Sequence, residues 1–388
     1  MKPCLKAMAL LSLCWSACVS AQTAQPKWRV DLRERYQFQA FDRTINFRWT
    51  LHQGVIFLSS ERVLVYQVNR SRGAAKLAPR DASGGSGNFI LEIKVLNAQD
   101  GAEIKSLQLT TNAEFSKVIA TRDGRFIVRT GDVLYLYSSE FARLASRALP
   151  LERKAQEEGW QIGVSPSGDE VQLVHQQILK RNALSPSSSV EKARADIEIL
   201  SADNLQTIKS FSLPWFLAAW SAADHALLSS SPTTWAPAAT FGLLGFDGQW
   251  SALMPDWTSA EHPCAYQAVA LEHQLFAAFG CGNLSVFPRT GEKLFSVKTD
   301  KKEFVGSLQG DGDFLVIQWE RHVVRHDTSA NIPITMAEPL RLDLYQIRSS
   351  HPLLSVALHH GTIYYAVSQT GAVAVVDGTT LDLYSPVH

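Results

Sequence analysis

The chain has 388 residues, which is long enough for one large repeat domain or for two to three domains of ordinary size. Its 37 basic and 37 acidic residues balance, so no global charge points to nucleic acid or to an anionic membrane surface as a partner. With 46% apolar residues, including ten Trp, the composition excludes general disorder.

The first residues have the pattern of a secretion signal. Lys2 and Lys6 precede an apolar run over residues 7–15, and Val-Ser-Ala at residues 19–21 matches a signal-peptidase site. We therefore expect a signal peptide over residues 1–21 that is cleaved after Ala21. The remaining protein would be exported to the periplasm or to the extracellular medium.

Two further points concern the membrane. Cys18, which ends the stretch Trp-Ser-Ala-Cys, permits a lipoprotein with an acylated cysteine, although Trp15 stands where such signals carry an aliphatic residue. We favour the cleaved, unacylated form. No later stretch reaches the roughly 18 uncharged apolar residues that a membrane-spanning helix needs, so we expect no transmembrane segment.

Strand–turn–strand units recur along the rest of the chain. Each has a short polar or glycine-containing turn between runs of apolar residues, as in "KVIATRDGRFIVRT" from Lys117. Their separations, from 40 to 71 residues, fit one four-stranded unit per repeat. The seven turn centres lie near Gln53, Gly124, Gly168, Asp224, Glu272, Gly312 and His360. A second hairpin follows four of the units, beginning at Glu92, Ile197, Phe241 and Leu284.

Four-stranded antiparallel repeats cannot bury both of their faces alone, so they stack around an axis and close into a ring. We predict an all-β fold, a seven-bladed β-propeller of four-stranded antiparallel blades, formed as a single domain by residues 22–388. Closing the ring requires a strand from one end of the chain. Residues 27–38 would add an outer strand beside residues 372–377, and residues 381–385 are the competing donor. The sequence leaves both open, and both can contribute.

Short stretches of the repeats resemble a known superfamily. "VLNAQDGAEIK" from Val95 and "VFPRTGEKLF" from Val286 resemble the third and fourth strands of quinoprotein-like propeller repeats. "SPSGDEVQLV" and "TRDGRFIV" are similar to the first turn of YVTN and WD40-like bacterial propellers. The resemblance implies the propeller fold and leaves function open, because propellers host many functions. Quinoprotein repeats carry Trp four residues after the turn glycine, where this chain has Lys105 and Phe295, which argues against a pyrroloquinoline cofactor.

Cys264 and Cys281 are the two cysteines outside the predicted signal, and they flank the fifth hairpin. If this hairpin turns at Glu272 and His273, the two cysteines stand opposite each other. In an oxidising compartment we expect a cross-strand disulfide between them. The alternative is two separate buried thiols. A metal site is disfavoured because this segment supplies no further ligands.

Strand topology predicts where a binding site lies. In each blade the first and third turns share one face of the ring, and the other connections open on the opposite face. The long connections open on that opposite face, over residues 71–88, 149–160, 176–195, 231–240, 254–264 and 328–339. Binding residues favour such loops on a rigid scaffold. The strongest candidate group combines exposed indoles with acids and an imidazole able to hold a peptide or sugar, namely Trp235, Asp256, Trp257, Glu261 and His262. Alternatively, these tryptophans cover the blade ends and the charges are solvated.

Other motifs carry less. His322 and His326 are more typical of surface histidines than of a metal site, and Asp311 with Asp313 suit a turn better than calcium. We find no nucleophile elbow, P-loop or dinucleotide-binding fingerprint, and assign no catalytic or metal-binding residue and no cofactor. We expect an exported, non-catalytic, monomeric binding or scaffold protein whose partner is a protein, peptide or glycan. The alternative is a propeller hydrolase, lyase or oxidoreductase with a metal or cofactor in its central channel.

Overall fold

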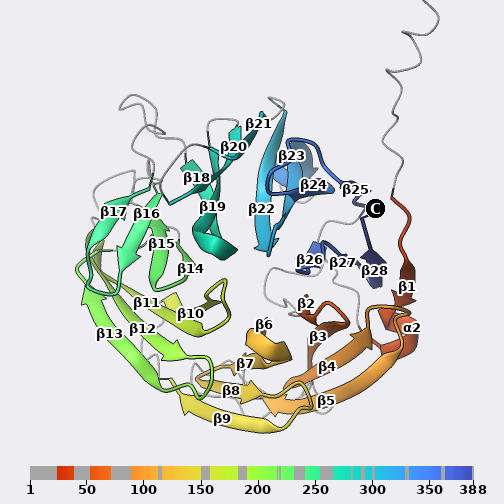
Figure 1. Ribbon diagram of the computed structural model, residues 1–388, viewed down its shortest axis with the longest axis horizontal. Coiled ribbons are helices and arrows are strands. Elements are labelled where there is room, and N and C mark those ends of the chain that lie inside the picture. Colours follow the sequence, from red (N-terminus) through yellow and green to blue (C-terminus); the bar gives the residue numbers. More distant parts are fainter. Residues whose placement is uncertain are drawn as a thin grey trace, which may run out of the picture.

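The computed structural model describes residues 24–38, 53–70, 89–111, 116–149, 158–181, 190–215, 217, 220–230, 241–253, 265–280, 283–289, 293–298, 302–327, 332–359 and 363–386. These residues form seven four-stranded antiparallel sheets arranged in a ring (Figure 1). The prediction of an all-β, seven-bladed β-propeller is confirmed. Over the same ranges, no helix has both the length and the apolar content needed to cross a bilayer.

The four strands of each blade are called A to D in order from the central axis to the outer rim. Blade I consists of β2 (Gln53–Ser59), β3 (Arg62–Arg70), β4 (Phe89–Asn97) and β5 (Glu103–Thr111). Blade II consists of β6 (Ser116–Ala120), β7 (Phe126–Thr130), β8 (Val133–Tyr137) and β9 (Arg143–Ala148). Blade III consists of β10 (Glu158–Val164), β11 (Glu170–Arg181), β12 (Val190–Ser201) and β13 (Thr207–Leu213).

Blades IV to VII follow in the same order around the ring. Blade IV consists of β14 (Trp220–Ala223), β15 (Ala226–Ser230), β16 (Phe241–Gly245) and β17 (Trp250–Ala252), and blade V of β18 (Ala265–Leu271), β19 (Leu275–Gly280), β20 (Asn283–Pro288) and β21 (Phe295–Lys298). Blade VI consists of β22 (Glu303–Asp311), β23 (Phe314–Asp327), β24 (Ile332–Gln346) and β25 (Leu354–Ala357). Blade VII consists of β26 (Ile363–Val367), β27 (Val373–Asp377), β28 (Thr380–Tyr384) and β1 (Trp28–Asp31).

The hydrophobic core lies between neighbouring blades. Among the described residues, seven buried clusters each join one pair of adjacent sheets around the ring. Successive side chains of a strand point to opposite faces, so one strand serves two clusters. In β19, Phe276 belongs to the cluster shared with blade IV, whereas Phe279 belongs to the cluster shared with blade VI. Each blade is therefore stabilised by both neighbours.

Both ends of the described chain close the ring. In blade VII, β28 pairs with β27, and β1 pairs with β28 as the outermost strand, with Trp28 opposite Leu383. The N-terminal strand therefore lies beside residues 380–384, not beside residues 372–377 as predicted, because the competing segment occupies the place between them. The N-terminal strand ends at Asp31, which begins the short helix α2 (Leu32–Tyr36). The Asp31 carboxylate accepts hydrogen bonds from the backbone N–H groups of Arg33 and Glu34, which caps the helix and terminates the strand.

Two of the seven predicted first turns were wrong. The A–B turn of blade I follows Ser59, not Gln53, which is the first residue of β2. The predicted hairpin around His360 joins β25 of blade VI to β26 of blade VII, and these strands pair with β24 and β27 instead of with each other. A strand–turn–strand pattern alone does not show which sheet each strand enters.

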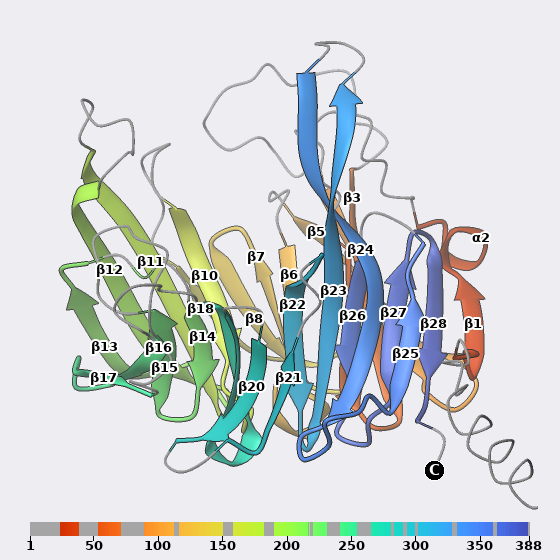
Figure 2. The same cartoon turned by 90° about the horizontal axis from the view of Figure 1, so that it is seen from above.

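Two of the predicted long loops are largely strand. β11 and β12 stay paired as far as Arg181 and Val190, and β23 and β24 stay paired as far as Asp327 and Ile332. Both hairpins extend to the same side of the ring (Figure 2). We call this side the hairpin face, and the opposite side, which carries the A–B turns, the turn face. Residues 71–88, 231–240 and 254–264 lie outside the described residues.

Candidate functional site

The site residues predicted from sequence lie outside the part of the chain that the structure describes. This applies to Trp235, Asp256, Trp257, Glu261 and His262, to Cys264 and Cys281, and to the predicted signal over residues 1–21 with Cys18.

The hairpin between the two cysteines is described. Its turn has three residues, η4 (Glu272–Gln274), instead of the expected two. A bulge between Ala265 and Gln267 compensates for the extra residue, so Ala265 pairs with Gly280. The residue after Cys264 is thus paired with the residue before Cys281.

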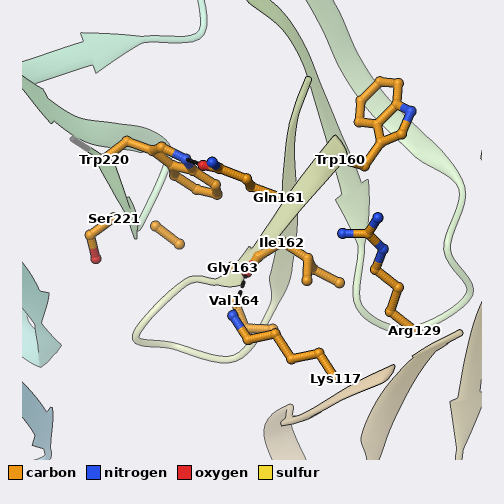
Figure 3. A pocket seen from close by; sticks show the side chains of 10 residues that line it. Lys117, Arg129, Trp160, Gln161, Ile162, Gly163, Val164, Trp220 and Ser221 are labelled. Carbon is orange, nitrogen blue, oxygen red and sulfur yellow. Dashed lines mark hydrogen bonds between the residues drawn. The ribbon is translucent and has the colours of Figure 1, made fainter. Parts of the chain in front are cut away.

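The central channel holds a cavity of about 500 Å³ at the inner strands of blades II, III and IV, which we call the channel pocket (Figure 3). It is lined by Lys117, Arg129, Trp160, Gln161, Ile162, Gly163, Val164, Trp220, Ser221 and Ala222. Lys117, Trp160 and Trp220 lie near the first residues of β6, β10 and β14. The pocket therefore lies toward the hairpin face, because the A–B turns follow the last residues of these strands.

Two cations of blade II form one wall of the channel pocket. Lys117 and Arg129 stand directly opposite each other in the β6–β7 ladder, an arrangement in which like charges repel. The Lys117 Nζ donates a hydrogen bond of 3.1 Å to the backbone carbonyl of Ile162, and Arg129 Nε donates to the carbonyl of Gly131 at 3.3 Å. Among the described residues, no carboxylate forms an ion pair with Lys117.

The environment of Lys117 disfavours its charged form. The side chain is accessible from the channel, yet the surrounding blades displace part of the water that would hydrate its ammonium group. This desolvation lowers the pKa of Lys117, and the positive charge of Arg129 lowers it further.

Tryptophans occupy the other parts of the channel pocket. The Trp220 Nε1–H donates to Gln161 Oε1, so the indole is held by its neighbouring blade. Trp160 is buried and stacks on His175, with ring centroids 5.0 Å apart. A Cβ on Gly163 would lie 3.0 Å from the Ala222 Cβ, so glycine allows blades III and IV to approach closely here.

A larger hollow of about 1310 Å³ opens on the turn face and is lined by the A–B turns. Val164, Ser221 and Ala222 line both this turn-face hollow and the channel pocket. The hollow is rich in carboxylates, namely Glu61, Asp123, Asp169, Asp224, Glu272 and Asp311. Among the described residues, no group of three or more His, Cys, Asp and Glu side chains is arranged to hold a metal ion. The channel thus has a cationic pocket toward one face and an acidic hollow at the other.

Several of these carboxylates contact residues of other blades. Asp169 pairs with Arg122 at 3.1 Å, and Asp224 accepts from the backbone N–H of Ser167 at 3.0 Å. Gln369 donates to Glu272 at 3.1 Å and also hydrogen-bonds Asp311. Burial, together with the negative charge of Glu272, raises the pKa of Asp311 to about 6.

No sequence pattern predicted the channel pocket, although one of its hairpins is among the predicted units. The register of "KVIATRDGRFIVRT" places Lys117 opposite Arg129, which could have been read from the turn position. The approach of Trp160 and Trp220 from other blades has no such signal, because it depends on how the sheets are placed around the axis.

The chain was compared with known proteins. No protein-family model matches it, and no curated protein matches it. Similar solved structures include an acylaminoacyl peptidase in complex with Z-Gly-Gly-Phe-chloromethyl ketone, at a TM-score of 0.53 and 8% identity over 90% of this chain and 54% of that one. The Pyrococcus horikoshii acylaminoacyl peptidase matches with a TM-score of 0.51 and 10% identity over 85% of this chain and 50% of that one. BamB from Moraxella catarrhalis matches with a TM-score of 0.37 and 11% identity over 88% of this chain and 86% of that one.

The chain spans about half the length of these peptidases. At such low identity the likeness concerns the fold alone. The expected resemblance to propeller proteins is thereby confirmed at the level of the fold: the chain is a seven-bladed β-propeller.

Proposed function

We propose that this protein is an exported, monomeric, non-catalytic β-propeller that binds a protein, peptide or glycan partner through its hairpin face. The propeller fold fits a binding or scaffold role, since it presents connections of many blades on a rigid ring. The observation that carries the proposal is the pair of hairpins, β11–β12 and β23–β24, which extend to one side of the ring (Figure 2).

The β23–β24 hairpin also carries an exposed apolar side chain. Val324 is 61% exposed, the highest value for a large apolar residue among those described. It follows Arg321 and His322, and the His322 ring stacks on Phe304 with centroids 4.2 Å apart. Apolar area beside charged and aromatic groups is typical of protein-binding surfaces.

Hairpin trimming tests this proposal. In one variant residues 178–193 are replaced by Asn-Gly, which joins the register partners Gln177 and Arg194 by a two-residue turn. In a second variant residues 324–335 are replaced in the same way between Val323 and Met336. Purified residues 22–388 are immobilised, partners from an envelope extract are identified by mass spectrometry, and their affinity is measured with the purified components.

We expect at least one trimmed variant to lose tenfold or more in affinity while its unfolding midpoint stays near that of the parent. Val324→Asp should lower the affinity for the same partner. The matched control Leu144→Asp, at a 51% exposed position on the outer strand β9, should leave the affinity unchanged. Full affinity in both trimmed variants would contradict a role of the hairpin face.

Export has its own test. We propose that the chain is cleaved after Ala21, which rests on the charged and apolar pattern of residues 1–21, and that Cys264 and Cys281 form a disulfide, which the pairing of Ala265 with Gly280 supports. The intact mass of the protein from a cell envelope fraction should correspond to a start at Gln22, with both thiols unreactive until reduction. A retained leader, an acylated Cys18 or two free thiols would each contradict part of this proposal.

A further inference from the structure

We propose that the channel pocket binds an oxyanion, a carboxylate or phosphate group, whose apolar body lies against Trp220. Lys117 and Arg129 would hold the charge. This small-ligand site is separate from partner binding on the hairpin face, so it stands or falls on its own experiment.

The position of Lys117 in the pocket costs stability and suits an anionic ligand. Lys117 and Arg129 are opposite each other across two paired strands, where mutual repulsion disfavours the folded protein. No described carboxylate forms an ion pair with Lys117, which donates a hydrogen bond to the neutral carbonyl of Ile162. The ten described residues that line the pocket include no acidic side chain. A bound oxyanion would screen the repulsion between the two cations, and its charge-assisted hydrogen bonds would compensate for the hydration that Lys117 has lost.

The backbone of β10 adds donors to these side chains. β10 is the innermost strand of blade III, so its channel-side edge has no partner strand. In an antiparallel ladder, alternate residues direct their N–H and C=O groups to opposite edges. Ser165 N–H donates to Glu170 of β11, whereas the Ile162 carbonyl accepts from Lys117 on the other side. The N–H groups of Ile162 and Val164 therefore face away from β11, within reach of the pocket.

The remaining walls suit a flat apolar group. The Trp220 indole is held in place by its hydrogen bond to Gln161, which leaves the Gln161 amide nitrogen available as a donor (Figure 3). The absence of a side chain at Gly163 keeps the wall beside Trp220 smooth. A volume of about 500 Å³ is within the range of small-molecule sites.

Binding is tested by titrating residues 22–388 with benzoate, phenyl phosphate and the neutral benzyl alcohol, using calorimetry and tryptophan fluorescence. We expect at least one anion to bind tenfold or more tightly than the alcohol, because charge-assisted hydrogen bonds are worth about a factor of ten or more. The preferred anion then identifies the head group, carboxylate or phosphate. Equal binding of all three probes, or binding of none, would overturn the proposal.

Variants locate the site. Lys117→Met and Arg129→Gln should each lower the affinity for the anion at least tenfold. Trp220→Phe should remove most of the fluorescence change that accompanies binding. Lys209→Met, at an exposed position of the outer strand β13, is the matched control and should bind as the parent does. Anion binding that persists unchanged in Lys117→Met and Arg129→Gln would place the ligand elsewhere and refute the assignment. Unfolding midpoints verify that each variant folds.

Discussion

At the scale of single residues, the channel concentrates unfavourable charge. The blade cores are apolar, yet the channel places Lys117 opposite Arg129 toward the hairpin face and Asp311 beside Glu272 on the turn face. Charges in such positions cost stability unless something compensates them. Removing the charge of Lys117 or of Asp311 should therefore stabilise the free protein, which distinguishes these two groups from structural ion pairs.

Lys117→Met should raise the stability of the ligand-free protein. The substitution keeps most of the side-chain volume while it removes a partly desolvated charge and its repulsion with Arg129. We expect a gain of about 0.5 to 1 kcal/mol in the free energy of unfolding, measured by urea denaturation at pH 7. The control Lys209→Met should change it by less than about 0.5 kcal/mol. A clear loss of stability in Lys117→Met would show that the ammonium group supports the fold.

Asp311→Asn should have a pH-dependent effect. Because the pKa of Asp311 is raised to about 6 in the folded protein, from 3.8, the folded state holds the proton more tightly than the unfolded chain does. Stability from this group is complete below about pH 4 and is lost as pH rises through 6. The neutral amide should stabilise the protein by about 2 kcal/mol at pH 7.5, and by much less at pH 4.5.

The groups that act on the Asp311 carboxyl are Glu272, whose charge contributes to the shift, the amide of Gln369 and the backbone N–H of Gly312. His273 Nε2 lies 3.9 Å from Glu272 Oε2. Asp313→Asn, at an exposed position of the same turn, is the control and is measured over the same pH range. Parallel stability–pH curves for the two variants would refute the raised pKa of Asp311.

At the scale of elements, the A–B turns determine how closely the blades approach on the turn face. Gly168 has a φ of +76°, and a Cβ at this position would lie 2.7 Å from the backbone nitrogen of Arg122 in the turn of blade II. The carbonyl of Gly168 accepts from that same nitrogen at 3.4 Å. The two turns are thus in direct backbone contact, and no flexible side chain can move aside.

A pair of glycine substitutions separates conformational strain from crowding. Gly248 also has a positive φ, of +81°, but a Cβ there would meet nothing within 4 Å. Both Gly168→Ala and Gly248→Ala should lose about 1 kcal/mol from the left-handed backbone. Gly168→Ala should lose at least about 1 kcal/mol more, because Arg122 must shift. Equal losses in thermal or urea unfolding would show that the turns separate freely.

At the scale of the whole molecule, ring closure joins the two ends of the chain. The cluster between blades VII and I contains Val30, Leu32 and Phe38 from the N-terminal segment together with residues of both blades. Arg29 binds both carboxylate oxygens of Asp382, at 2.7 and 2.8 Å, and Trp28 Nε1 donates to the Ala98 carbonyl of blade I at 3.0 Å. The N-terminal segment thus connects the last blade to the first.

Leu32→Ala should destabilise the entire ring. Leu32 is fully buried at this junction, and such truncations cost about 2 to 5 kcal/mol. Because every blade depends on both neighbours, we expect a single cooperative transition at a lower urea midpoint, without separate loss of blade VII. Leu144→Ala, at a 51% exposed site, should shift the midpoint only slightly. A Leu32→Ala midpoint equal to that of the parent would contradict the role of the junction.

The sequence by itself determined the class of fold and the number of blades. Alternating apolar runs and turns such as "TRDGRFIV" report strand pairing between neighbours in the chain, and this local pairing repeats seven times. Local pattern also identified five of the seven first turns, as at Gly124 and Gly168, and both segments that close the ring.

Only the tertiary structure decided which strands share a sheet and what lies on the axis. A short connection between two strands has the same sequence pattern whether the strands belong to one blade or to two. For this reason the unit around His360 was assigned to a single blade, although its strands lie in blades VI and VII. The channel pocket combines Lys117 with Trp160 and Trp220, which lie 43 and 103 residues further along the chain. Such residues meet because sheets pack face to face around a centre, and that packing leaves no period in the sequence.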